Sequence, residues 1–212
     1  PANNPAMIRS LDQMVEKVLS LKRKQRIAVA WAQDSNTIGA VFKAVKEGFA
    51  EAVMIGDASA IKKVCAENGI DHSLFTIVSA DNEADAAAKA VKLAVSDKAD
   101  VVMKGLVGTD KFLKAVMDKE VGLMLPGATL AYVGAVEIPA YHKLLFLTDL
   151  AVIPYPDLSQ KIAMAEYAIE MARKFGIEKP RIALIGASEK VSRHFPGTAD
   201  YTEMCNAAAD PP

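Results

Sequence analysis

A lysine and two glycines separate a short apolar run from an amphipathic segment, in the stretch Lys104-Gly-Leu-Val-Gly-Thr109. The run before it, residues 101–103, is apolar and β-branched and predicts a strand buried on both faces of a parallel sheet. Gly105 and Gly108 allow a tight turn, and Thr109 is expected to cap the following helix. A helix start offers free N–H groups and a positive dipole end, so the loop predicts a phosphate site with Lys104 beside it. The alternative is a plain strand-to-helix junction.

The elements that must position this loop are four consecutive strand–helix units. A preceding helix is expected to begin after Ser10. The predicted strands are residues 27–32, 52–55, 75–78 and 99–103, and the helices that follow them are the segment carrying Ile38 to Val45 and residues 58–68, 82–97 and 109–118. This alternation predicts a parallel sheet with right-handed crossovers and helices on both faces.

In such a sheet, a ligand binds outside the carboxyl ends of the strands. Besides the Lys104 loop, two groups of residues are predicted at those ends: Gln33, Asp34 and Ser35, and then Gly56 and Asp57. The first group is equally well interpreted as a helix cap and the second as a turn, so a ligand role stays open for both.

The strand–helix rhythm stops after Val121, where a Pro/Gly-rich break begins. Residues 128–136 and 143–148 predict two strands with no helix between them, which favours antiparallel pairing. A long helix over 157–174 and a strand over 181–185 follow. We therefore predict a first α/β subdomain over residues 7–125 and a second, mixed-sheet subdomain over 126–212. Residues 1–6 are expected to be a leader outside the fold.

Other chemistries find little support in the residues. The chain lacks a GxGxxG opening a helix after the first strand and any GxxxxGK[ST], and its three histidines have no metal-ligand spacing, so no metal is expected. Ser188 lacks a GxSxG elbow, and His194 beside Arg193 is only suggestive. Asp149, directly after an apolar strand, is a candidate cleft carboxylate, with a turn residue as the alternative.

Composition narrows the class of protein. The chain has 212 residues, 51% of them hydrophobic, and a formal net charge of −1, which disfavours nucleic acid and membrane surfaces as partners. The basic cluster at residues 22–26 is interpreted as solvated cations after a helix, the alternative being an anion-binding patch. Two cysteines without pattern and no signal or membrane segment favour the cytoplasm.

Several motifs occur together in a recognisable order. They are Val29-Ala-Trp-Ala-Gln-Asp-Ser35, Val102-Met-Lys-Gly-Leu-Val-Gly-Thr109 with Phe112-Leu, Lys119-Glu-Val-Gly-Leu123, Leu144-Leu-Phe-Leu-Thr-Asp149 and Tyr155-Pro-Asp-Leu158. In this combination, from about Met7 to about Thr198, the chain resembles the phosphate acetyl/butyryl transferases, and the butyryl branch most closely.

The resemblance implies an isocitrate/isopropylmalate dehydrogenase-like fold of two α/β subdomains, with the active site between them and a homodimer or higher oligomer built through the second. The implied substrates are acyl-CoA and inorganic phosphate, without a tightly bound cofactor. The loop residues Lys104, Gly105, Gly108 and Thr109 are implied in substrate binding. Lys114 stands where relatives have an arginine, and it keeps the charge but not the bidentate fork.

The resemblance also implies that family members continue beyond residue 212 with a Ser-Arg pair and a catalytic Asp, so the second subdomain is expected to be incomplete. Ser192-Arg193 lies in a different segment and is not matched to that pair. No catalytic residue is therefore assigned, and Asp149 remains the candidate.

The leading hypothesis is a phosphate acyltransferase, acetyl or butyryl, with the acyl chain unspecified. One alternative is a non-catalytic module that binds CoA or dimerises. Another is an acyl-carrier-protein:phosphate acyltransferase, against which the stretches Thr148-Asp149 and Tyr155-Pro156 argue.

Overall fold

The computed structural model describes residues 6–209, which divide into two compact units. The larger unit runs from Val15 to Ala128, and the second combines the described residues up to Met14 with those from Thr129 onward. Each unit is described here by itself.

The grouping of the N-terminal residues differs from the expected range of 7–125, because the chain before Val15 belongs with the C-terminal segments. The N–H of Ile8 donates to the Phe175 carbonyl at 2.9 Å, and the N–H of Leu11 donates to Glu137 Oε2 at 2.9 Å. Helix α1, Leu11–Ser20, begins after Ser10 as predicted, with Ser10 Oγ accepting the N–H of Gln13 at 3.1 Å.

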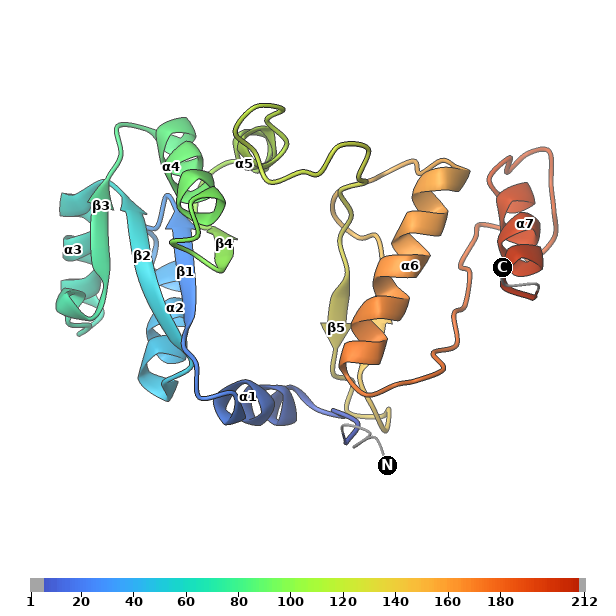
Figure 1. Ribbon diagram of the computed structural model, residues 1–212, viewed down its shortest axis with the longest axis horizontal. Coiled ribbons are helices and arrows are strands. Elements are labelled where there is room, and N and C mark those ends of the chain that lie inside the picture. The colour runs from blue at the N-terminus through green and yellow to red at the C-terminus, as the bar shows by residue number, and fades with distance from the viewer. Residues whose placement is uncertain (1–5, 210–212) are drawn as a thin grey trace. The chain divides into compact units, whose positions relative to one another are not determined.

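The larger unit is built on a four-stranded parallel sheet in the order β3-β2-β1-β4 (Figure 1). The strands are β1 Gln25–Ala30, β2 Ala50–Gly56, β3 Thr76–Ser79 and β4 Val101–Lys104. β1 pairs with a strand on each side, so that Val29 lies opposite Met54 of β2 and Met103 of β4. The α/β class and the parallel first sheet are thus confirmed.

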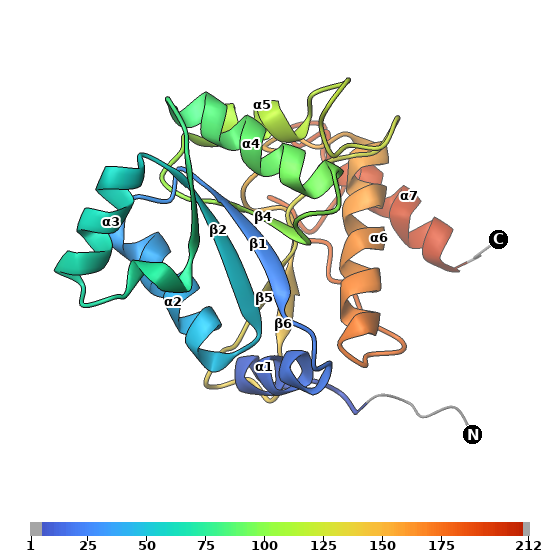
Figure 2. The same ribbon diagram turned by 60° about the vertical axis from the view of Figure 1, so that its left-hand side comes forward.

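Helices cover both faces of this sheet, as Figure 2 shows with α4 above it and α2 below. The helices are α2 Ser35–Glu47, α3 Ala58–Glu67, α4 Glu83–Val95 and α5 Thr109–Val116, with a short 3₁₀ turn, His72–Leu74, before β3. One buried cluster joins Val29 and Met54 to Ile38 of α2 and Ile61 of α3. The opposite cluster packs Ile55 against alanines of α4, where small side chains let the helix approach the sheet closely.

One prediction about β4 is wrong. Residues 101–103 are not buried on both faces, because β4 is an edge strand of the described sheet and Val101 is 42% exposed. An apolar β-branched run predicts a strand, but the position of that strand in the sheet depends on the path of the whole chain.

The second unit contains a two-stranded antiparallel sheet and two helices. Its elements are β5 Gly134–Val136, β6 Leu145–Leu147, α6 Leu158–Lys174 and α7 Thr198–Ala209. The predicted antiparallel pairing is confirmed by the register Ala135 opposite Phe146. α6 begins at a capping box between Asp157 and Gln160, as the turn signals before it indicated.

Three expectations for this unit need correction. The strand over 128–136 shrinks to β5, and residues 181–185 have no strand pairing, so the described sheet is antiparallel rather than mixed. Ile185 is 84% exposed and lines an open groove with β6 and α6. The final helix α7 was not predicted, because its apolar residues follow no helical stripe strong enough to be read as amphipathic.

A nearly buried lysine connects α6 to α7. The ammonium of Lys161, whose side chain is 10% exposed, lies 2.8 Å from Asp200 Oδ2 and 3.2 Å from the Gly197 carbonyl. It also lies 4.8 Å from the centroid of the Tyr201 ring, a cation–π distance. The hydroxyl of Tyr201 in turn donates to the Ile185 carbonyl at 3.0 Å.

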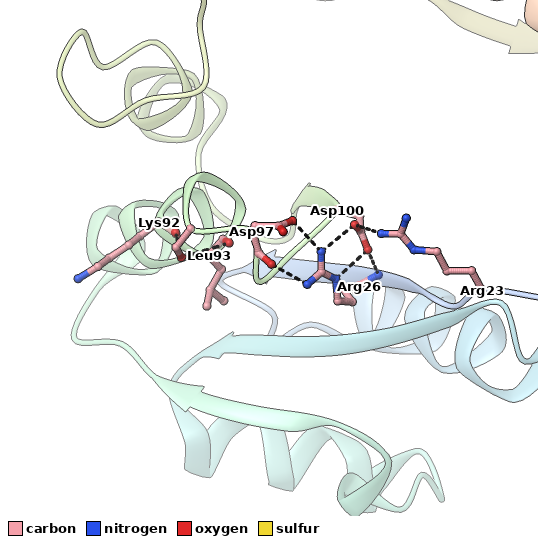
Figure 3. Close-up of polar contacts among 7 residues, drawn as sticks. Arg23, Arg26, Lys92, Leu93, Asp97 and Asp100 are labelled. Carbon is pink, nitrogen blue, oxygen red and sulfur yellow. Dashed lines mark hydrogen bonds and ion pairs between the residues drawn. The ribbon is translucent and has the colours of Figure 1, made fainter.

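At the amino end of the larger unit's sheet, two arginines share one aspartate (Figure 3). Arg26 donates from Nη2 to Asp100 Oδ1 at 2.9 Å and from Nε to Oδ2 at 3.0 Å, and Arg23 reaches Oδ1 at 2.6 Å. A further bond joins Arg26 Nη1 to the Asp97 carbonyl at 2.6 Å. Arg23 and Arg26 are therefore fixed ion-pair partners, which argues against the anion-binding interpretation of the basic cluster.

The Asp100 carboxylate should make the larger unit sensitive to acid. The side chain and then the N–H of Arg26 hold the pKa of Asp100 well below its usual range. A carboxyl with a lowered folded pKa stabilises the fold above its unfolded pKa of about 4 and loses that contribution as pH falls further. The melting temperature of Asp100→Asn should thus be below that of the parent at pH 7, with the gap narrowing towards pH 3.

Asp97→Asn is the matched control. Asp97 adopts φ 54°, which asparagine tolerates. Its Oδ1 lies 3.1 Å from Arg26 Nη2, but its side chain is 97% exposed, so this pair is expected to contribute little to stability. Its melting temperature should follow that of the parent across the whole range. An unchanging gap for Asp100→Asn from pH 7 to pH 3 would contradict the role of the ionised pair.

Candidate functional site

The loop after β4 is held against the end of β1 by backbone hydrogen bonds. The N–H of Gly105 donates to the Ala30 carbonyl and that of Leu106 to the Trp31 carbonyl, both at 2.9 Å. A Cβ atom on Gly105 would lie 2.6 Å from the Trp31 oxygen and 2.7 Å from the Ala30 oxygen. Only glycine therefore fits at this position, and the loop extends the β1–β4 ladder beyond the strands.

The prediction that Thr109 caps α5 is wrong. Gly108, with φ −57° and ψ 139°, is the N-cap and makes no side-chain cap bond, whereas Thr109 is already the first helical residue. A residue in helical conformation cannot cap its own first turn as an N-cap residue does. The helix start is therefore at the expected place, but its N–H groups are not capped by Thr109.

An acidic side chain from α4 meets this helix start. Glu83 Oε2 lies 2.6 Å from the ammonium of Lys111, in the first turn of α5. The ammonium of Lys111 holds the pKa of Glu83 below its ordinary value, against the opposing effect of burial. The same pairing raises the pKa of Lys111.

Sequence reasoning missed Glu83 and Lys111. The one available signal was Glu83 directly after Asn82, at the start of a predicted helix on the same sheet edge as the Lys104 loop. Residues 28 positions apart become neighbours only once β4 lies beside β1, so their pairing was not visible in the spacing.

At the carboxyl ends of β1 and β2, aspartates cap the helices that follow. Asp34 caps α2, its Oδ2 accepting the Thr37 N–H at 2.9 Å, and Asp57 caps α3 through Ser59 and Ala60. This supports the cap interpretation of Asp34, whose Oδ1 is nevertheless buried without a partner among the described residues. Asp57, for which a plain turn was the alternative to a ligand role, is the N-cap of α3. Ser35 is the first, exposed residue of α2.

Gln33 links two of these strand ends. Its Oε1 accepts the N–H of Asp57 at 3.0 Å, and a Cβ on Gly56 would lie 2.5 Å from the same oxygen. Gly56 thus gives room for this bond. Trp31, two residues before Gln33, has φ 58°, a left-handed conformation that is costly for a bulky residue and that clusters at functional sites.

The two predicted substrate-binding lysines lie on different elements, one in β4 and one in α5. Lys104 is exposed at the end of β4, with Nζ 3.3 Å from the Gly105 carbonyl. Lys114 is exposed in the last turn of the helix, where it lowers the pKa of Asp118 more weakly than the N–H groups of Val121 and Glu120 do. The structure thus brings Lys104, Gly105, Gly108 and Thr109 into one loop and places Lys114 away from it.

Asp149 belongs to the second unit and is surrounded by backbone donors. Its Oδ1 accepts the N–H groups of Ala151 at 2.7 Å and Val152 at 2.8 Å, and its Oδ2 accepts that of Tyr132 at 2.8 Å. Burial would raise the pKa of Asp149, but these bonds outweigh it and lower the pKa. This arrangement supports the turn interpretation, and a catalytic role for Asp149 stays a prediction.

The remaining predicted residues form no further cluster. Within residues 6–209, no group of three or more His, Cys, Asp or Glu side chains is placed to hold a metal ion. Across that same range, none of the helices combines the length and apolar character needed to cross a membrane.

The family model described as "Phosphate acetyl/butaryl transferase" matches residues 10–88 and 76–210. These ranges include every strand and helix of the larger unit from β1 onward as well as α6. The chain therefore belongs to the phosphate acetyl/butyryl transferase family, as its motifs indicated.

Curated relatives carry the names of both branches of the family. A "Phosphate butyryltransferase" from Clostridium acetobutylicum is 42% identical over 194 residues, covering 92% of this chain and 64% of the relative. A "Phosphate acetyltransferase" from Thermotoga maritima is 31% identical over 188 residues, covering 88% of this chain and 63% of the relative. The chain thus spans less than two thirds of the length of these relatives.

Solved structures show the same arrangement of elements. A branched-chain phosphotransacylase from Enterococcus faecalis V583 superposes with a TM-score of 0.72 at 27% identity, covering 88% of this chain and 64% of that one. A phosphotransacetylase from Streptococcus pyogenes gives 0.74 at 17% identity, over 95% of this chain and 70% of that one, which is evidence for the fold alone.

Gly105→Ala should destabilise the larger unit. The added methyl would press on two backbone oxygens that cannot move aside, and such overpacking costs roughly 1–3 kcal/mol. Thermal unfolding measures the loss. The matched control is Gly39→Ala within α2, where no atom lies within 4 Å and alanine should raise stability by about 0.5–1 kcal/mol. Equal stabilities for the two variants would refute the close approach at Gly105.

Asp149→Asn tests the turn interpretation. An amide keeps one oxygen acceptor but turns its NH₂ group towards a backbone N–H, at a cost of roughly 1–3 kcal/mol. Asp118→Asn is the matched control, because Asp118 accepts the N–H groups of Glu120 and Val121 with Oδ1 alone. We expect a lower melting temperature only for Asp149→Asn. Lost acyl transfer with an unchanged melting temperature would instead make Asp149 catalytic.

Proposed function

We propose that this protein is a phosphate acyltransferase that exchanges acyl-CoA and inorganic phosphate for an acyl phosphate and CoA. The observation that carries the proposal is the family match over residues 10–88 and 76–210, which includes the loop from Lys104 to Thr109. The names of relatives from the butyryl and the acetyl branch support either acyl group.

The Lys104 loop is proposed to take the phosphate. Three features support this role: an exposed ammonium at the carboxyl end of β4, a backbone fixed to β1, and a helix start without a side-chain cap of its own. Anions are stabilised by helix N-termini and by nearby lysines. Gly105, Gly108 and Thr109 supply the loop backbone, and Lys114 is proposed as a further contact to an anionic part of the substrate.

The proposed step is a direct acyl transfer. A phosphate oxygen forms a bond to the thioester carbonyl carbon, the carbon–sulfur bond breaks, and CoA leaves as a thiolate that takes up the proton that the phosphate gives up. Such a reaction needs aligned reactants, positive charge at the phosphate and donors for the developing oxyanion. Lys104 and the amides of the loop are proposed to meet the first two needs, and no residue of the chain is assigned as general base.

The wider setting follows from the same proposal. CoA acts as a substrate rather than as a bound cofactor, and neither nucleic acid nor a membrane is a partner. The protein is proposed to work as a homodimer or higher oligomer through the second unit. A cytoplasmic location is supported by two free cysteines, the buried Cys65 and the exposed Cys205, which suit a reducing compartment.

One pair of measurements tests the function. Acyl phosphate formation is followed in a coupled assay with butyryl-CoA or acetyl-CoA and phosphate, and CoA binding is measured by calorimetry on the same sample. Turnover supports the transferase. Binding without turnover supports the non-catalytic CoA-binding module, and neither binding nor turnover would overturn both.

Lys104→Ala should weaken phosphate binding without changing the fold, because the side chain is exposed and its one bond is to its neighbour's carbonyl. Losing a charge-assisted bond to phosphate costs roughly 1.5–3 kcal/mol, or about a 10- to 150-fold weaker phosphate affinity. The exposed Lys43 on α2 provides the matched control in Lys43→Ala. An unchanged phosphate KM for Lys104→Ala would remove Lys104 from the site.

A further inference from the structure

We propose that Trp31 is a specificity-determining residue of the phosphate acyltransferase, and that its ring contacts the acyl chain of acyl-CoA beside the Lys104 loop. The inference deepens the proposed function and rests on it for the identity of the substrate. It is carried by a break in the regular pattern of β1, which moves this one side chain to the other face of the sheet.

The hydrogen bonds between β1 and β2 show that Trp31 is an extra residue in its strand. The N–H of Gln25 donates to the Phe49 carbonyl at 2.8 Å at the start of the pair. With the register unchanged, six residues further along both strands, the Ile55 carbonyl should accept the N–H of Trp31. It accepts the N–H of Ala32, at 3.1 Å. One additional residue on one strand is a β-bulge, and bulges re-aim side chains next to active sites.

The side chains of the same strand show the same break. Val29 belongs to the buried cluster beneath α2 and α3, and Ala30 belongs to the opposite cluster against α4. Regular alternation would return Trp31 to the side of Val29. Its ring packs against the α4 cluster instead, and Ala32 is the residue that returns to the first cluster. Trp31 therefore shares the face that holds the loop's buried Val107.

The backbone of the bulge does not itself require a side chain at this position. Its φ of 58° is the conformation that such a bulge usually gives to glycine, and it is unfavourable for a bulky residue. A glycine would leave the Trp31 carbonyl free to accept the Leu106 N–H at 2.9 Å, as it does now. Part of the tryptophan ring is buried in the α4 cluster, and part stays open to solvent. The open part is available to a ligand.

The place of the ring beside the loop favours the acyl chain over the other parts of acyl-CoA. A phosphate held by Lys104 must lie in contact with the thioester carbonyl carbon during transfer, so the acyl chain begins at this loop. The adenine of CoA lies at the far end of the pantetheine arm. Two apolar side chains with accessible surface meet here, Trp31 and Leu106, and Leu106 is 55% exposed. Each methylene that leaves water there should gain about fourfold in binding.

The intrinsic fluorescence of the parent protein tests the contact directly, because Trp31 is the single tryptophan of the chain. Saturating butyryl-CoA should change the emission strongly, acetyl-CoA less, and CoA or inorganic phosphate little. CoA carries the same adenine and so controls for its absorbance. An equal change with CoA would overturn the assignment to the acyl chain. No change while calorimetry shows bound butyryl-CoA would overturn the contact itself.

Kinetics of three variants measure the specificity. Trp31→Gly removes the ring and keeps the bulge, because glycine adopts a φ of 58° without strain. We expect the ratio of kcat/KM for butyryl-CoA to that for acetyl-CoA to fall about tenfold, with the phosphate KM within about twofold. Trp31→Ala should lose the ratio equally but melt at a lower temperature than Trp31→Gly. Trp31→Phe keeps an aromatic surface and should restore most of the ratio. An unchanged ratio in Trp31→Gly would overturn the proposal.

Phe42→Ala is the matched control for lost packing. It removes a partly buried aromatic ring of α2 that packs against the opposite cluster of the same sheet. Its melting temperature should fall while the butyryl-to-acetyl ratio stays that of the parent. A ratio that falls as far in Phe42→Ala as in Trp31→Gly would show a general effect of packing and overturn the specific role of Trp31.

The two proposals fail in different ways. If the parent protein neither binds acyl-CoA in calorimetry nor forms acyl phosphate, the proposed function is wrong and the role of Trp31 falls with it. If the parent forms acyl phosphate and Trp31→Gly keeps the butyryl-to-acetyl ratio, the function stands and the role of Trp31 is wrong.

Discussion

The pairing of β1 with a parallel strand on each side is the constraint on which the larger unit depends. It requires β2 and β4 to run in the same direction as β1, so each must be reached by a helical crossover. Their carboxyl ends then meet at one edge, which brings Gln33 to Asp57 and the Lys104 loop to Trp31. At the opposite edge, the bonds between Arg26 and Asp100 hold the register of the same strands.

Local sequence patterns were sufficient to predict most strands and helices of this unit, but not which of them lie next to one another in the fold. The β-branched runs and the helix-capping residues determined where strands and helices begin, to within a few residues. Val101 was misjudged because exposure at a sheet edge depends on strand order, which no short window of sequence contains. Residues 181–185 have strand composition without strand pairing, and α7 forms without a clear apolar stripe, because both depend on contacts within the second unit.

The candidate site likewise has one part that could be predicted from the sequence and one part that could not. The glycines and the lysine of the 104–109 loop were recognisable because a tight turn needs residues without a Cβ, and the close approach at Gly105 gives the physical reason. The ion pair between Glu83 and Lys111 depends on the chain path that brings α4 beside α5, so it could not be predicted from the spacing of the two residues in the sequence. The loop's phosphate role and a catalytic role for Asp149 remain predictions, the latter with its carboxylate oxygens already bonded to backbone N–H groups.

The lysine between α6 and α7 has a consequence for how this part of the molecule can evolve. Lys161 is 10% exposed and satisfied by Asp200, Gly197 and the Tyr201 ring. Replacing Asp200 alone would leave the Lys161 ammonium without its carboxylate partner in a poorly solvated place. A change of this kind lowers the free energy of unfolding by several kcal/mol. Lineages that lose one partner should therefore lose the other as well, so positions 161 and 200 are expected to vary together rather than independently among natural sequences.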